Sequence, residues 1–189
     1  LFRGPGVMQD GISGYPTELG DPALADESFV LRHARILDVL CLSTNAVHVG
    51  AYDALAAMAR ELGHDPSPYA ARAASLRAAI ESTFWDEDQQ RYAYLVEPAT
   101  GARVLHEEEF GVALAVLLDV TPPEQAARLV ASAHRSPHGV VNLWPHFDGY
   151  DDTHPARHNA MCWPMVMGVW AWAVAATGQA DLFGQDLKH

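Results

Sequence analysis

Basic residues are scarce in this 189-residue sequence. Twelve lysines and arginines stand against 24 aspartates and glutamates, Lys188 is the only lysine, and the formal net charge is −12 at pH 7. Proteins that neutralise phosphates need clustered basic side chains. This shortage argues against nucleic acid or an anionic membrane surface as a partner, and it favours neutral or weakly charged partners.

Cysteine and long apolar runs are also rare. Cys41 and Cys162 are the only two cysteines, and they lie far apart among apolar residues, which argues against a disulfide framework and a zinc-ligand pair. No leader with basic and then apolar residues opens the sequence, and no apolar run approaches the roughly 20 residues that cross a bilayer. We therefore expect a soluble protein, with the cytoplasm as the favoured location.

Three common catalytic motifs are missing. Gly11-Ile12-Ser13-Gly14 does not have the spacing of the G-x-S-x-G nucleophile motif, and the sequence has neither a phosphate-binding glycine loop nor H-E-x-x-H. A serine hydrolase, a nucleoside triphosphatase and a zinc protease of these types are set aside.

Helical periodicity dominates what is present. Apolar residues recur at three- and four-residue spacing, with glycine or proline at the segment ends, over residues 28–40, 46–62, 67–84, 110–118, 123–134 and 156–177. Residues 92–96 and 103–105, separated by Thr100-Gly101, predict one short β-hairpin. We predict an all-α fold of helical hairpins in one domain, residues 1–189, because such hairpins bury their apolar faces only by packing on neighbours.

Residues 1–27, rich in glycine, proline and acids, are expected to form a long functional loop. Within it, Asp10 lies among apolar and aromatic residues in Met8-Gln9-Asp10-Gly11-Ile12-Ser13-Gly14-Tyr15. Burial there could raise the pKa of the Asp10 carboxyl enough for general acid catalysis near neutral pH. The alternative is that Asp10 bonds loop amides, as aspartate commonly does in turns.

A second candidate segment combines aromatic rings with amide and carboxylate groups. It comprises Trp144 with the loop that follows it, and His158-Asn159-Ala160-Met161-Cys162-Trp163-Pro164. Sugars suit such sites, since their C–H faces stack on rings and their hydroxyls take directional hydrogen bonds. We predict Trp163 as a sugar contact, whereas Trp170 and Trp172 are expected in the core.

Two polar clusters are given simpler interpretations. The histidines and aspartates between His146 and His158 match neither an EF-hand nor a zinc pattern, so no metal or other cofactor is predicted. Glu107-Glu108-Glu109 stands at a helix start, where acids favour the helix dipole, so its expected role is structural, although one of the three could face a cleft.

Together these motifs resemble the six-hairpin (α/α)6-toroid glycosidases, in particular their trehalase-like, processing α-glucosidase-like and glycogen-debranching glucosidase-like branches. The resemblance rests on the order of Met8-Gln9-Asp10-Gly11, Ser43-Thr44-Asn45-Ala46, Phe84-Trp85-Asp86, Tyr92-Ala93-Tyr94, Gly139-Val140-Val141 and the His158 to Pro164 motif, in which Ala160 replaces a usual glycine. It implies that Asp10 is the general acid. It also implies that Asn45, His158, Asn159 and Trp163 lie at or near the sugar, and Trp144 joins them from the residue pattern.

The resemblance also implies that this chain is about half of a catalytic domain. A toroid needs about twelve helices, and the family's catalytic base is a glutamate beyond the Trp-Pro motif, whereas no glutamate follows Glu124 here. We expect a glycoside hydrolase that cleaves an α-glucoside-like or related small saccharide with inversion, with other segments or subunits completing the toroid. The alternatives are a phosphorolytic enzyme on the same toroid and a non-catalytic carbohydrate-binding or scaffold module.

Two structural expectations follow. Asp10, Trp144, His158 and Trp163 should line a common pocket at one end of the hairpins. Half a toroid should also expose apolar helix faces that the missing hairpins would cover.

Overall fold

A computed structural model describes residues 1–7 and 34–188 of the chain. Six α-helices account for about half of these residues: α1 (Leu42–Glu61), α2 (Ser67–Phe84), α3 (Glu109–Leu117), α4 (Pro123–Ser132), α5 (Pro164–Ala176) and α6 (Ala180–Asp186). The predicted all-α class is confirmed.

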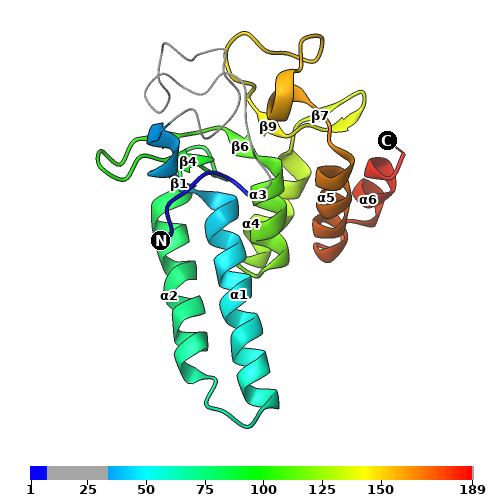
Figure 1. Cartoon of the computed structure of the whole chain (residues 1–189). Helices are drawn as coiled ribbons and strands as arrows, with labels where there is room; N and C mark the ends of the chain where they lie inside the picture. The colour runs from blue at the N-terminus through cyan, green and yellow to red at the C-terminus, as the bar shows by residue number, and fades with distance from the viewer. Residues whose placement is uncertain (8–33, 189) are drawn as a thin grey trace.

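The six helices form three consecutive antiparallel hairpins. Helices α1, α3 and α5 pack side by side in one row, and α2, α4 and α6 each return beside the helix that precedes them. Figure 1 shows the short strands and connecting loops gathered at one end of this row. The loops therefore sit where the odd-numbered helices begin, and this end carries the candidate site.

The short strands tie the loops to one another. They are β1 (Leu40–Cys41), β2 (Trp85–Asp86), β3 (Arg91–Tyr92), β4 (Leu95–Val96), β5 (Arg103–Val104), β6 (Glu107–Glu108), β7 (Arg135–Ser136), β8 (Gly139–Val140) and β9 (Leu143–Trp144). All pairings are antiparallel: β1 with β4, β4 with β5, β2 with β3, β6 with β9 and β7 with β8. The predicted hairpin is confirmed as β4–β5, and the other strands were not predicted because two-residue pairings leave almost no sequence pattern.

Local sequence signals mark the turn of the first hairpin, where α1 ends and α2 begins. Gly63 follows α1 with a φ of 71°, a left-handed conformation that glycine adopts without steric cost. Ser67 and Pro68 open α2, as predicted, because proline at the first turn gives up no helical hydrogen bond. The apolar spacing over residues 46–62 predicts one buried face of α1. This prediction was partly wrong, since Leu55 and Leu62 are exposed. At about 1.5 Å per residue, the 20 residues of α1 reach well past the nine of α3, which leaves the far half of the hairpin uncovered (Figure 1).

Two other helix predictions were wrong. The segment 34–41, expected as the end of a helix, is a 3-10 turn (Ala34–Leu37) followed by β1, because strand pairing with β4 captures its last residues. The expected helix 156–177 is a π-helical turn (Ala156–Ala160), an extended link and then α5. Pro164 cannot donate a backbone hydrogen bond to the preceding turn, so it starts a new helix there.

Two hydrophobic clusters hold the fold. The larger joins the helices through residues such as Ile80, Phe84, Val112 and Trp170, all less than 2% exposed. The smaller lies among the loops and joins Ile36, Val39, Cys41, Tyr94, Leu95, Leu143 and Phe147. The second cluster gives the loop end its own core, so the site residues stand on packed structure.

Among the described helices, the stretch His158–Ala176 is long and apolar enough by composition to cross a membrane. It is interrupted between the π-turn and α5, and its residues Trp170, Ala173 and Val174 are completely buried in the main cluster. The buried side of α5 therefore forms part of the core of the helical domain.

Candidate active site

Asn142 joins the elements that form the loop end. Its backbone N–H donates to the Met161 carbonyl (3.1 Å), its side-chain amide donates to the His158 carbonyl (2.8 Å), and its own carbonyl accepts the Glu109 N–H (3.1 Å). These bonds place the start of α3, strand β9 and the segment 158–161 side by side. No sequence signal singles out Asn142, because asparagine between strands is a common turn residue.

His158 and Trp163 form an aromatic pair at this junction. Their rings stack with centroids 5.1 Å apart and an interplanar angle of 14°. His158 has a φ of 54°, a left-handed conformation that is uncommon for residues other than glycine and that clusters at functional sites. The indole Nε1 of Trp163 is buried and has no hydrogen-bond partner among the described residues. Two predicted sugar contacts are thus adjacent, and Trp163 offers a donor for a ligand.

Trp144 lies on the neighbouring strand and is part of a second aromatic group. Its ring stacks on His134, with centroids 3.6 Å apart and an angle of 7°, and His146 meets it edge-on at 5.0 Å. The β9 strand that carries Trp144 packs against the π-turn that carries His158. Three of the predicted sugar contacts therefore lie at one end of the hairpins.

The two predicted asparagines are completely buried. The amide of Asn45 donates to the carbonyls of Phe2 (3.0 Å) and Cys41 (2.9 Å), and its oxygen accepts the Phe2 N–H (2.8 Å). The oxygen of Asn159 accepts the Phe147 N–H at 3.1 Å. These bonds give both side chains a positioning role, and Asn45 holds the N-terminal segment against α1.

Asp10, the predicted general acid, lies outside the described residues. The pockets lined by described residues include one of about 530 Å³ between α4 and the start of α6, and two smaller ones beside α2 and α5. Trp144, His158 and Trp163 line none of these three. The predicted common pocket with Asp10 stays a prediction.

The largest departure from the sequence analysis concerns the run of three glutamates. Glu107, Glu108 and Glu109 are all buried, at 4%, 0% and 0% exposure, whereas the expected role was to favour the dipole of a helix start. Strand β6 pairs with β9 and its two residues are covered on both sides, with α3 starting immediately after it. No sequence signal distinguishes this run from an exposed acidic cap.

Glu108 is held by the first turn of α1. Ser43 donates its hydroxyl to Oε1 (3.1 Å), and the Cys41 thiol donates to Oε2 (3.6 Å). Burial raises the pKa of Glu108 to about 7, although these two hydrogen bonds oppose the shift. Burial also raises the pKa of the Cys41 thiol, with the Glu108 charge adding to it. The group is a fixed structural joint between α1 and α3.

Glu107 and Glu109 form a separate acidic pair. Burial raises the pKa of Glu107, and Arg91, whose Nε lies 3.9 Å from its carboxyl, opposes the shift. Burial and then the charge of Glu107 raise the pKa of Glu109 well above its ordinary value. Neither Glu109 oxygen has a hydrogen-bond partner among the described residues. Carboxyls with such strongly raised pKa values gather preferentially at functional sites.

Comparison with known proteins identifies the family. Residues 19–189 match the family described as "Mannosylglycerate hydrolase MGH1-like glycoside hydrolase domain". The chain belongs to this glycoside hydrolase family. A comparison with curated proteins found no significant match.

Solved structures support the same fold for this MGH1-like chain. One is the GH63 mannosylglycerate hydrolase of Thermus thermophilus in complex with glucose, with 19% identity and a TM-score of 0.68 over 89% of this chain and 39% of that one. The structure of that enzyme in complex with Tris gives 19% identity and a TM-score of 0.62 over 79% and 36% of the two chains. The chain therefore spans about two fifths of these relatives and has the fold of part of a six-hairpin toroid.

Proposed function

We propose that this chain is the acid-bearing part of an inverting glycoside hydrolase that cleaves an α-glucoside-like or related small saccharide. Mannosylglycerate, the substrate in the name of the solved relatives, is the first compound to test. We assign residues 1–189 to a single catalytic domain, whose toroid other segments or subunits complete. A cytoplasmic location fits the two free cysteines, Cys41 and Cys162.

The observation that carries the proposal is the meeting of Trp144, His158 and Trp163 at the loop end of a chain that matches a glycosidase family. Partly buried indole rings offer flat apolar surfaces for the C–H face of a sugar. The Nε1 of Trp163, which has no partner among the described residues, can donate one hydrogen bond to a sugar oxygen. Asn159 would act indirectly, by holding the Phe147 backbone of the loop that follows Trp144, and Asn45 by holding the N-terminal segment against α1.

The proposed chemistry needs two carboxyls. Asp10 would protonate the leaving-group oxygen, and a base outside this chain would activate water on the opposite face of the sugar. In inverting enzymes the two carboxyls stand roughly 6.5–9.5 Å apart so that water fits between the base and the sugar. Burial raises the pKa of the Glu107 and Glu109 carboxyls and so favours their neutral forms, which would limit the negative charge near the site.

The decisive experiment is Asp10→Asn in the intact protein, with Asp88→Asn in an exposed turn as the matched control. One positioned general acid contributes about 10²–10⁴-fold, so the rate on mannosylglycerate, whose glycerate is a poor leaving group, should fall by about that factor. An activated aryl glycoside of the same sugar scarcely needs protonation and should lose much less. The control should keep both rates.

Other outcomes identify the alternatives. Equal losses on both substrates would make Asp10 a binding or structural residue, and unchanged rates would remove it from the site. Turnover that requires inorganic phosphate and releases a sugar phosphate would identify a phosphorylase. Sugar binding without any turnover by the intact protein would identify a carbohydrate-binding module. NMR of the first product formed would test inversion directly.

A further inference from the structure

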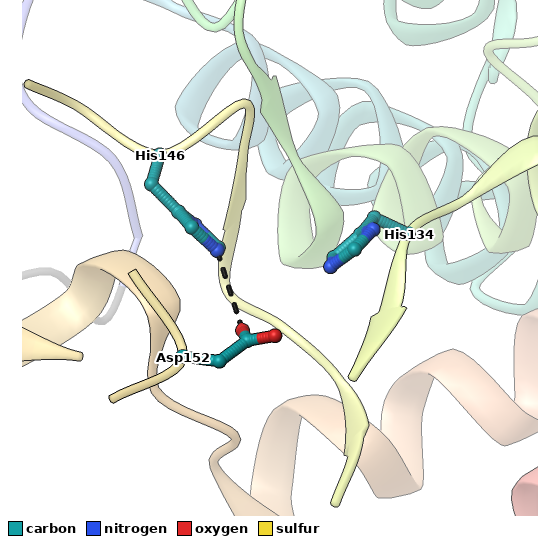
Figure 2. Close-up of side chains that lie close together, drawn as sticks. All are labelled: His134, His146 and Asp152. Atoms are coloured by element: carbon teal, nitrogen blue, oxygen red, sulfur yellow. Dashed lines mark ion pairs between the residues drawn. The ribbon is translucent and has the colours of Figure 1, made fainter. Parts of the chain in front are cut away.

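Three potential metal ligands meet beside the Trp144 ring. His134 follows α4, His146 follows β9, and Asp152 lies on the loop between β9 and the π-turn. One ligand atom from each lies within 4.8 Å of the other two. Figure 2 shows the His134 ring directed toward the His146–Asp152 pair. His134 precedes β7, whereas His146 and Asp152 share the loop after β9, so only the folded chain brings the three together.

The hydrogen bonding of His146 fixes which ring nitrogen is available. Its Nδ1 lies 2.8 Å from the Leu143 carbonyl, and because a carbonyl oxygen only accepts, Nδ1 carries the hydrogen. In the neutral ring the Nε2 lone pair is then free, and it faces Asp152 Oδ1 at 3.5 Å. A backbone carbonyl on the opposite nitrogen is the usual arrangement around a metal-bound histidine.

His134 contributes the third potential ligand atom, a ring nitrogen. Its Nε2 is buried and has no hydrogen-bond partner among the described residues. Stacking against Trp144 at 3.6 Å holds the ring in place. A buried polar atom without a partner is unfavourable, so its presence favours a ligand at this position.

A proton and a metal ion would provide bonding partners to different numbers of atoms in this cluster. A proton on His146 Nε2 would serve only the pair with Asp152 and would leave the Nε2 of His134 as it is. A divalent ion would accept lone pairs from all three groups at once. Zinc binds nitrogen and oxygen at about 2.0–2.2 Å, which places ligand atoms roughly 3–3.5 Å apart. His146 and Asp152 already meet this spacing, and the half-exposed Asp152 can close the remaining distance.

We propose that His134, His146 and Asp152 bind one divalent transition-metal ion. Two imidazoles and one carboxylate suit zinc and its neighbours in the first transition row, and water would complete the coordination. The ion would fasten the loop that carries Asp152 to the end of α4 and would fix the Trp144 ring between them. No metal was predicted from the sequence, because the histidines and aspartates between His146 and His158 match neither an EF-hand nor a zinc pattern; His134 lies outside that run.

Direct metal binding tests the proposal without any substrate. The intact protein, stripped with EDTA, is dialysed against Zn²⁺, and bound zinc per chain is measured. We expect one tightly bound zinc, at least about 10–100-fold weaker in Asp152→Asn and in His134→Gln. The matched controls are Asp148→Asn and His138→Gln, which alter exposed residues near the cluster and should bind zinc as the parent does.

Cobalt separates a defined site from loose surface binding. Co²⁺ bound by two imidazoles and a carboxylate should give visible absorption bands that Asp152→Asn changes and Asp148→Asn leaves alone. Asp152 is exposed enough for its variant to fold, which near-ultraviolet circular dichroism checks. Equal zinc affinity in the site variants and the controls, or the absence of a stoichiometric zinc, would overturn the proposal.

Discussion

Helices α3 and α5 stand next to each other in the same row, yet they are buried to different extents. Seven of the nine residues of α3 are buried, including Glu109 and Gly111. Helix α5 buries Trp170 and Val174 but exposes a second apolar face. That face consists of Met165, Gly168, Trp172, Ala175 and Ala176, which recur at the spacing of one helix side.

Position in the row explains this difference. Helix α3 has α1 on one side and α5 on the other, whereas α5 has an inner neighbour on one side only among the described helices. The same holds for α1, where Val47, Leu55 and Met58 are exposed. These open faces agree with the expectation for half a toroid. Apolar composition alone therefore does not tell a covered helix from one at the edge.

The strongest effect that we predict contrasts two tryptophans of α5. Trp170 is 0% exposed, as predicted, but the expectation that Trp172 lies in the core is wrong. Trp172 is 67% exposed, because it stands on the side of α5 that no described helix covers. Trp170→Ala should cost about 3–5 kcal/mol in the free energy of unfolding, because it removes buried surface and leaves a cavity. Trp172→Ala should change it by less than about 0.5 kcal/mol. Urea unfolding of both variants of this chain measures the difference.

The same pair tests how α5 is covered in a longer protein. If further hairpins seat on the open face, Trp172→Ala in the intact enzyme should approach the cost of Trp170→Ala. Near-zero cost in both settings would mean that nothing packs on this face. Comparable costs in the chain alone would contradict the contrast between the two sides of α5.

The second effect that we predict is a pH dependence of stability, caused by the buried carboxyl of Glu108 at the start of α3. The pKa of Glu108 is raised to about 7 in the folded state, so the folded state binds its proton more tightly than the unfolded chain does. Its contribution to stability is fully present below pH about 4.5 and is lost as the pH rises through about 7. At about 1.4 kcal/mol per pH unit, the loss amounts to about 3 kcal/mol.

Unfolding followed between pH 5 and 8 checks this linkage. The chain should be more stable at the acidic end, and Glu108→Gln should flatten the curve by removing this proton. The raised pKa values of Glu107 and Glu109 act in the same direction and should leave a smaller slope. Glu61→Gln, on the exposed part of α1, is the control. If the parent protein were more stable at pH 8 than at pH 5, the conclusion that Glu107, Glu108 and Glu109 are buried would be wrong.

The smallest effect that we predict comes from comparing Gly111 of α3 with Gly168 of α5. An added Cβ at Gly111 would lie 2.6 Å from Glu108 Oε2 and 3.3 Å from the Ser43 backbone nitrogen, whereas at Gly168 it would meet nothing within 4 Å. Gly111→Ala should cost about 1–3 kcal/mol through overpacking. Gly168→Ala should stabilise by about 0.5–1 kcal/mol, because alanine loses less backbone entropy in a helix. Thermal melts of the two variants should shift in opposite directions.

The candidate site was predictable where its residues are close in the sequence. His158 and Trp163 form one short motif, and their stacking follows from a turn and an extended link between them. Trp144 and His134 stack more closely, but β7 and β8 separate them along the chain, so no local pattern reveals the contact. The roles of Asn142 and Glu109 depend on strand β9 meeting the start of α3. Such long-range pairing leaves no periodic signal.

Local sequence was enough to define the helical class, most helix boundaries and the resemblance to six-hairpin glycosidases. These properties depend on neighbours within a few positions: apolar spacing, Gly63 after α1, and proline at the start of α2 and α4. In contrast, the burial of three consecutive glutamates and the covering of particular apolar faces emerged only from the packed fold. The meeting of His134, His146 and Asp152 belongs to the same group. Burial and convergence are set by segments distant in the sequence, and the physical cost of an unpaired polar atom becomes visible only when those segments are in place.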